Sequence, residues 1–110
     1  MAIGRLDERV TLQARTETQD AAGQSSASWT TVGDVWADAE TLSGREFYAA
    51  QQAQQGVAVR IRIRYRSDIS SLHRVIWRGA AHDIKAVIER NESRRNYVDL
   101  MCTAGTSIAQ

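Results

Sequence analysis

The sequence contains a single cysteine, Cys102, so it can form neither an intramolecular disulfide nor a cysteine cluster that binds a metal. It has no run of about 18 apolar residues that could span a membrane as a helix. The N-terminus also lacks the continuous apolar segment of a secretory signal peptide. These absences predict a soluble polypeptide that is made in a reducing cytosol and has no membrane contact.

A large excess of charge of either sign is also missing, because 14 basic and 13 acidic residues leave a net charge of +1. The chain as a whole therefore has no general attraction for DNA or for an anionic membrane. The charges are unevenly distributed, however. Residues 1–55 have a net charge of −4 and residues 56–110 a net charge of +5. Either the two halves pair within one fold, or copies of the chain contact one another head to tail.

No catalytic or metal-binding motif is present. His82 and Asp83 occur in a chain with many serines, but no nucleophile elbow accompanies them. His73 and His82 lack cysteine or carboxylate partners at ligand spacing, so we expect both on the surface or in hairpins. We therefore predict a protein that is not an enzyme and that uses no cofactor or metal.

In residues 57–66, bulky apolar side chains at the odd positions alternate with Ala58 and four arginines at the even positions. A helix would spread its arginines around the whole circumference, whereas a strand separates the two kinds onto opposite faces. The pattern therefore predicts a long central strand. Its apolar face carries Val57, Val59, Ile61, Ile63 and Tyr65, and its other face carries the arginine row, which we define as Arg60, Arg62, Arg64 and Arg66.

Shorter alternating segments predict further strands, and Val98, Leu100 and Cys102 of the last one should face inward. We expect one domain over residues 1–110, mainly β, built as a small antiparallel β-barrel or sandwich of about six strands, because closure removes exposed sheet edges. The strands are expected at residues 8–14, 29–42, 57–66, 74–77, 81–89 and 97–103. The expected irregular segments are an N-terminal arm at residues 1–7, a long hairpin loop at 15–28 and a flexible tail at 104–110.

Residues 34–42 alternate less cleanly, because Trp36 falls on the same side as Asp38 and Glu40. Trp29 and Trp36 are large apolar side chains, and both could be core anchors. One of them could instead lie at a subunit contact, where tryptophan is enriched. The sequence leaves both options open.

Residues 43–56 differ in character from the strands around them. Ser43 followed by Glu46 fits a capping box, helix formers follow, and Gly56 is placed as a stop. The segment predicts a short helix inserted before the central strand. Phe47 and Tyr48 are its only bulky apolar residues, so it can bury only a narrow stripe. It either covers one end of the sheet or moves against a partner.

The arginine row allows two interpretations. Successive arginines on one face of a strand lie about 6.6 to 6.8 Å apart, close to the repeat of a nucleic-acid backbone. A small basic-faced barrel that binds single-stranded nucleic acid is therefore the alternative function. The interpretation that we favour is a solvated face, or pairing with the acidic residues Asp34, Asp38 and Glu40 of the first half.

Several short stretches, taken in order, resemble the head-tail joining proteins (head-closure or stopper proteins) of long-tailed bacteriophages and of related particles such as gene transfer agents. The resemblance covers nearly the whole chain and lies in the order and spacing of the stretches. They are residues 4–10, residues 20–23 with Trp29, residues 35–37, residues 42–46, residues 63–66, and Arg74 and Val75 with Gly79, Asp83 and Ile84.

The resemblance implies a structural virion protein made in the bacterial cytoplasm and located at the head-tail interface. It would form a homo-oligomeric ring beneath the portal and its adaptor, help to retain packaged DNA, contact that DNA without sequence preference, and offer a docking surface to tail proteins. The isolated chain could still be a monomer. An adaptor role with DNA gated elsewhere, or a tail-terminator-like ring, stays open.

The resemblance also places two sets of residues. The insertion at residues 44–56 would project towards the ring channel or a partner, and its candidate residues are Arg45, Glu46, Tyr48, Gln51, Gln52, Gln54 and Gln55. Contacts between subunits would join acidic residues to the arginine row, and these candidates are Asp34, Asp38, Glu40, Arg60, Arg62, Arg64 and Arg66.

Overall fold

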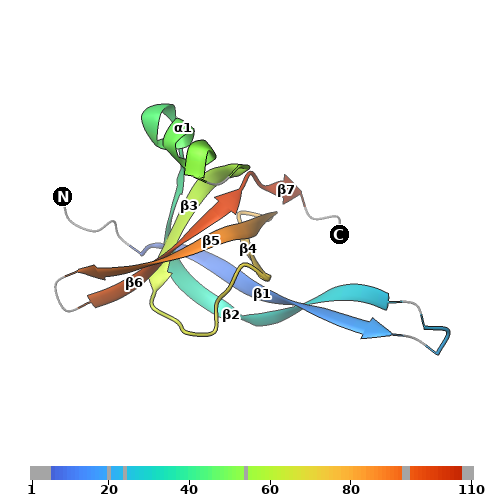
Figure 1. Ribbon diagram of the computed structural model, residues 1–110. Helices are drawn as coiled ribbons and strands as arrows, with labels where there is room; N and C mark the ends of the chain where they lie inside the picture. Colours follow the sequence, from blue (N-terminus) through green and yellow to red (C-terminus); the bar gives the residue numbers. More distant parts are fainter. Residues whose placement is uncertain (1–5, 20, 24, 54, 93–94, 108–110) are drawn as a thin grey trace.

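The computed structural model describes residues 6–19, 21–23, 25–53, 55–92 and 95–107. The predicted helix lies between the second and third strands (Figure 1). Predicted strands are found at every expected place, with longer ends in most cases. The elements are β1 (Glu8–Gln19), β2 (Ser25–Thr41), α1 (Gly44–Ala53), β3 (Val57–Arg64), β4 (His73–Trp77), β5 (Ala80–Glu92), β6 (Arg95–Thr103) and the two-residue β7 (Thr106–Ser107).

The strands form one antiparallel sheet that closes on itself. Its order is β4-β1-β2-β3-β6-β5, and a further ladder between β5 and β4 completes the ring, while β7 is added on the edge of β5. The prediction of a mainly β fold with one short helix before the central strand is confirmed. Of the two predicted architectures, the closed sheet is the barrel.

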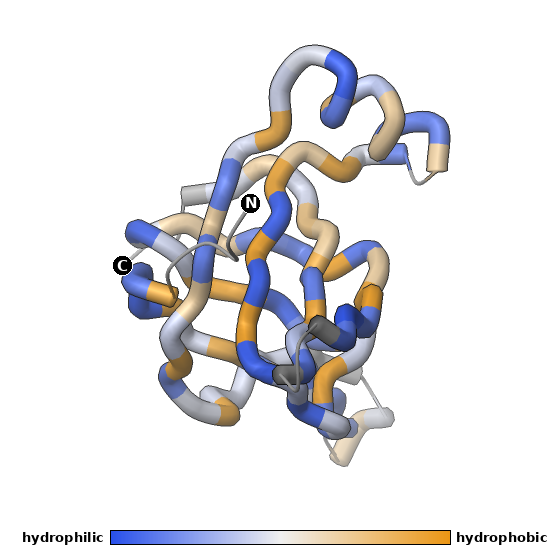
Figure 2. The backbone as a smooth tube through the Cα atoms, turned by 90° about the vertical axis from the view of Figure 1, so that its left-hand side faces the viewer, coloured by the Kyte–Doolittle hydropathy of each residue, from blue (hydrophilic) through white to orange (hydrophobic). Residues whose placement is uncertain are grey.

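Side chains on the inner face of the barrel form the core, and β3 is its centre. The buried and partly exposed residues of β3 alternate along the strand until Ile63, as its sequence pattern predicts. Figure 2 shows this alternation as orange and blue segments along the strands. Tyr65 is a correction: β3 ends at Arg64, so the alternation of inner and outer side chains does not extend to Tyr65. Its side chain is exposed, although its backbone N–H still donates to the carbonyl of Asn96 (3.0 Å).

The last strand supplies much of the core from the other half of the chain. Val98, Leu100 and Cys102 are buried, as predicted. Burial raises the pKa of the Cys102 thiol to about 12, so the thiol stays protonated at neutral pH. Cys102 is therefore packed as a small apolar core residue.

The long hairpin loop predicted for residues 15–28 is wrong. β1 continues to Gln19 and β2 begins at Ser25, so the two strands pair in register through most of that segment. Beyond Ala14, β1 pairs with β2 alone, and the two form a ribbon that leaves the barrel at the lower right of Figure 1. The polar composition of this segment suggested a loop. Threonine, however, is common in strands, and a ribbon that leaves the barrel does not need apolar side chains.

The predicted arm and tail lie partly outside the described residues, which begin at Leu6 and end at Ser107. Within that range the tail is not wholly irregular, because Thr106 and Ser107 pair with Ala81 and Ala80. In the described part of the chain, no helix is long and apolar enough to cross a membrane.

His82 was expected on the surface or in a hairpin, and it lies in the β4–β5 hairpin, opposite Val75, but not on the surface. Its ring is buried against that of Trp77, with the ring centres 5.6 Å apart. The carbonyl of Thr103 can only accept a hydrogen bond, so Nδ1, at 2.9 Å, must be the protonated ring nitrogen. The histidine thereby joins β5 to the end of β6.

We expect Gly105→Ala to lower the free energy of unfolding by about 1–3 kcal/mol, because overpacking forces its neighbours to shift. A Cβ at this position would lie 2.8 Å from the Cβ of Ala80 and 2.8 Å from Cε1 of the buried His82 ring. Urea unfolding measures the change. The matched control is Gly33→Ala, where a Cβ meets no atom within 4 Å. Equal stability of the two variants would contradict this close packing.

Candidate functional site

The inserted helix α1 stands outside the barrel, above β3 in Figure 1, and none of its residues is buried. It begins at Gly44, whose φ of +56° favours glycine, and the carbonyl of Ser43 accepts a hydrogen bond from the N–H of Phe47 (3.4 Å). The rings of Phe47 and Tyr48 meet edge to face. The helix therefore presents most of its surface to solvent, as expected for a segment with so few apolar residues.

Two side chains hold α1 to the rest of the protein. The amide of Gln51 donates to the carbonyl of Val57 (2.6 Å) and accepts from the N–H of Gly56 (3.2 Å), which closes the return to β3. Gly56 has a φ of +92°, in agreement with its predicted role as a stop. The carboxylate of Glu46 lies 3.8 Å from the guanidinium of Arg60. These contacts position the helix while leaving it weakly packed.

The predicted partner-facing residues of this segment therefore fall into two groups. Gln51 and Glu46 contact their own chain, although the Glu46 side chain is still 60% exposed. Arg45, Tyr48, Gln52 and Gln55 are exposed. Tyr48 is the most prominent, with 69% of its surface exposed. Gln54 lies outside the described residues.

The arginine row lies on the outer face of the barrel, where most of its members pair with acidic residues of the same chain. Glu40 is directly opposite Arg60 in the β2–β3 ladder, and their side chains form an ion pair at 2.8 Å. Arg66 forms two hydrogen bonds with the carboxylate of Asp68, and these lower the pKa of Asp68. The predicted pairing with the acidic residues of the first half is therefore confirmed for Arg60 and Glu40, whereas Arg66 pairs with Asp68 of the second half.

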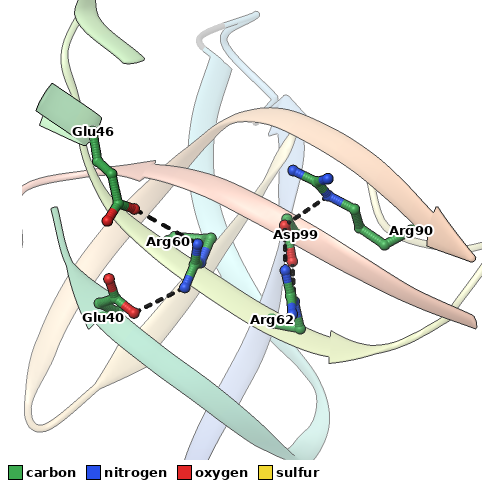
Figure 3. Close-up of polar contacts among 6 residues, drawn as sticks. All are labelled: Glu40, Glu46, Arg60, Arg62, Arg90 and Asp99. Carbon is green, nitrogen blue, oxygen red and sulfur yellow. Dashed lines mark hydrogen bonds and ion pairs between the residues drawn. The ribbon is translucent and has the colours of Figure 1, made fainter. Parts of the chain in front are cut away.

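Arg62 takes part in the most buried of these ion pairs, shown in Figure 3. Its guanidinium forms two hydrogen bonds with Asp99 on β6, at 2.6 and 3.1 Å, and Arg90 on β5 approaches the same carboxylate at 3.1 Å. Asp99 has no exposed surface, although it lies on the outer face of the sheet. The two arginines cover it and supply the donors that a buried carboxylate requires.

The other predicted contact residues are placed as follows. Asp34 accepts a hydrogen bond from the hydroxyl of Thr11 (2.7 Å), and Asp38 lies opposite Arg62 in the β2–β3 ladder. In the part of the chain that the structure describes, Arg64 forms no ion pair. It lies instead beside Trp36, whose side chain is 53% exposed.

Comparisons with known proteins identify the family. The model of the phage head completion protein family matches residues 1–105. The chain belongs to this family. The predicted resemblance is thereby confirmed, and it extends over nearly the whole sequence. A search of curated protein sequences finds no match.

Two solved structures show how far the fold of this head completion family member is shared. A protein of Shigella flexneri 2a, determined in solution, is 28% identical, with a TM-score of 0.74 over 94% of this chain and 96% of that chain. A chain from the virion of a native gene transfer agent particle is 19% identical, with a TM-score of 0.62 over 96% of this chain and all of that chain. At 19% identity, the similarity to the gene transfer agent chain shows a shared fold.

Sequence reasoning missed one residue of this family member and left the position of another open. Asp99 was not singled out, although its alternation with Val98 and Leu100 places it on the outer face of the last strand. Trp36 was assigned either to the core or to a subunit contact, and the structure excludes the core. The only sequence signal for its exposure was its position on the same side of the strand as Asp38 and Glu40.

Proposed function

We propose that this head completion protein forms a ring at the portal vertex, where it joins the DNA-filled head to the tail and helps to close the DNA channel. Family membership supports a role in completing the head. The observation that carries the finer proposal is the projection of α1 from a closed barrel without a single buried residue. A rigid barrel suits the body of a ring, and an exposed helix suits contact with neighbours.

In this proposal the exposed side of α1 faces the channel or an adjoining ring. Its residues there are Tyr48 and uncharged glutamines, with Arg45 as the one cation of the helix. Glutamine side chains can line a DNA passage without binding phosphate tightly, so DNA would be held there without sequence preference. The two contacts of Gln51 and Glu46 allow the helix to change position at low cost, as expected for an element of low local stability.

Contacts between copies are proposed for the charged outer face. Glu40, Arg60, Arg62 and Arg66 already have partners within the chain, so a neighbouring copy would find their charges largely compensated. Among the described residues, the acidic candidates Asp34 and Asp38 form no ion pair, so these two are proposed to face a neighbouring copy. The adaptor above and the tail protein below remain the proposed partners of the ring.

We expect Tyr48→Ala to reduce the yield of DNA-filled, tailed particles at least about tenfold, because an exposed aromatic side chain at an interface often acts as a binding anchor. The measurement uses cells that produce the particles and supply only the variant chain. Particles are counted by electron microscopy, and this chain is quantified in them by mass spectrometry. Leu72→Ala, which truncates another strongly exposed side chain on a loop, is the matched control.

Two outcomes would contradict the proposal at different levels. Normal yields with Tyr48→Ala, in particles that contain the chain, would show that α1 makes no essential contact. Absence of the wild-type chain from DNA-filled particles would remove the connector role itself. Urea unfolding of both variants shows whether the barrel is intact.

A further inference from the structure

A pocket opens where β2 and β3 separate. The ladder between these strands ends at the pair Ala37 and Ile63, and the chains then diverge. The pocket has a volume of about 310 Å³ and is lined by Val35, Trp36, Arg64 and Arg66. We call it the fork pocket. A second hollow of about 380 Å³ shares Trp36 and Arg64 with it and reaches Leu6 and Asp7, so the concave surface continues past the tryptophan.

Trp36 forms the apolar wall of the fork pocket. It is held on a strand, and the guanidinium of Arg9, its cross-strand neighbour, lies 5.0 Å from the centre of its ring. Half of the side chain nevertheless remains exposed. A large aromatic residue that is fixed in place and open to solvent is typical of an anchor for a binding partner.

Arg64 supplies an open positive charge on the opposite side of the same pocket. Arg66, the other cation in the lining, is already compensated by Asp68, whereas Arg64 has no carboxylate partner among the described residues. A guanidinium beside an apolar wall binds a carboxylate well, because the planar group forms two parallel hydrogen bonds. The fork pocket therefore combines one anion site with one apolar site.

The backbone next to the pocket offers a third element of recognition. In the described part of the chain, residues 25–36 of β2 pair with β1 alone, because β3 pairs only with residues 37–41. The second edge of β2 thus becomes free of ladder partners where the pocket begins. An extended peptide can bind such an edge through its main chain, and alternate side chains then reach the same face.

We propose that the fork pocket binds an extended segment of a partner protein in which an acidic residue stands two positions from an apolar or aromatic residue. The acidic side chain pairs with Arg64, and the apolar one packs against Val35 and Trp36. This inference goes beyond the proposed function, because it concerns the single chain and does not require a ring.

The charges of the site favour a peptide over nucleic acid. Nucleic-acid binding depends on several cations that neutralise successive phosphates. Arg60, Arg62 and Arg66 are compensated within the chain, and the adjoining hollow contains the carboxylate of Asp7. Arg9 lies over the Trp36 ring, which leaves Arg64 as the open cation in the pocket lining. One open arginine in the lining, beside a tryptophan, matches one carboxylate and one apolar side chain.

The test is a selection of random 12-residue peptides, displayed on ribosomes, against the immobilised full chain. We expect enrichment of peptides with Asp or Glu two positions from an aliphatic or aromatic residue, and at least tenfold weaker binding of these peptides to Arg64→Gln. Arg15→Gln removes the same charge from the β1–β2 ribbon, where the Arg15 side chain is 51% exposed, and should bind them normally. No enrichment over the Arg64→Gln chain, or equal loss in both variants, would overturn the proposal.

Nuclear magnetic resonance then locates the binding. Titration of a selected peptide into the isotope-labelled chain should shift the signals of the Trp36 indole, the Arg64 guanidinium and the amides of Val35 and Trp36. Shifts confined to other residues would overturn the proposal. So would the same shifts on adding a twelve-residue oligothymidylate, or on raising the protein concentration alone, because they would assign the pocket to nucleic acid or to a second copy. Failure of Tyr48→Ala to affect particles leaves these results unchanged, so the two proposals fail separately.

Discussion

Replacement of Asp99 by alanine is expected to lower the free energy of unfolding by about 3–5 kcal/mol, the usual cost of breaking a buried ion pair from one side. Asp99 has no exposed surface and receives hydrogen bonds from both Arg62 and Arg90. Only 13% of the Arg62 side chain is exposed, so its guanidinium would lose its closest carboxylate while it stays largely out of water. A small domain has a total stability of only about 5–15 kcal/mol, so this variant could be partly unfolded.

Urea unfolding at neutral pH measures the effect, and the chain provides a matched control. Asp68→Ala removes a carboxylate that also forms two hydrogen bonds with an arginine, but this ion pair is largely exposed. Its loss should cost no more than about 1 kcal/mol. Similar losses for Asp68→Ala and Asp99→Ala would show that burial does not determine the cost.

A double variant separates the loss of the ion pair itself from the cost of keeping the Arg62 charge largely buried after Asp99 is removed. Arg62→Met with Asp99→Val removes both charges and fills the space with apolar side chains. Replacement of a buried ion pair in this way is often neutral or stabilising. We therefore expect the double variant to be more stable than Asp99→Ala by at least about 2 kcal/mol. A double variant as unstable as the single one would show that the pair itself stabilises the barrel.

The parts of the fold that depend on local pattern could be predicted from the sequence. The alternation of residues 57–63 reflects a strand with one buried face and one partly exposed face. In the structure this strand, β3, is the centre of the barrel core. The helix follows from the change in composition after Leu42 and from the glycine at position 56. Both signals arise within about ten residues, where chain geometry alone determines which side chains share a face.

The parts that depend on distant residues could not be predicted. Arg62 and Asp99 are 37 positions apart, and only the β3–β6 register brings them together. The ribbon formed by residues 15–19 and 25–29 has a loop-like composition, and its pairing became visible only with the strands in place. The alternation with Asp38 and Glu40 placed Trp36 on the outer side of its strand, but no local pattern encodes the point at which β3 leaves the sheet beside it.

The largest effect in the core is expected for Ile61→Ala, which should lower the free energy of unfolding by about 2–5 kcal/mol. Ile61 is fully buried at the middle of β3, where its cross-strand neighbours are Ala39 and Leu100. The loss combines the transfer of the removed atoms with the cavity that they leave. Ladders to β2 on one side and β6 on the other hold the backbone, so the surrounding strands cannot collapse to fill that cavity.

Two variants test whether the effect comes from a cavity in a rigid core. Ile61→Val removes one methylene group and should cost only about 0.5–1.5 kcal/mol. Ile88→Ala makes the same chemical change on the outer face of β5, where the side chain is 41% exposed, and should cost less than about 1 kcal/mol. Urea unfolding measures all three free energies. If Ile61→Ala cost no more than Ile88→Ala, the barrel would be able to close around the missing atoms, and β3 could not be the rigid centre from which α1 projects.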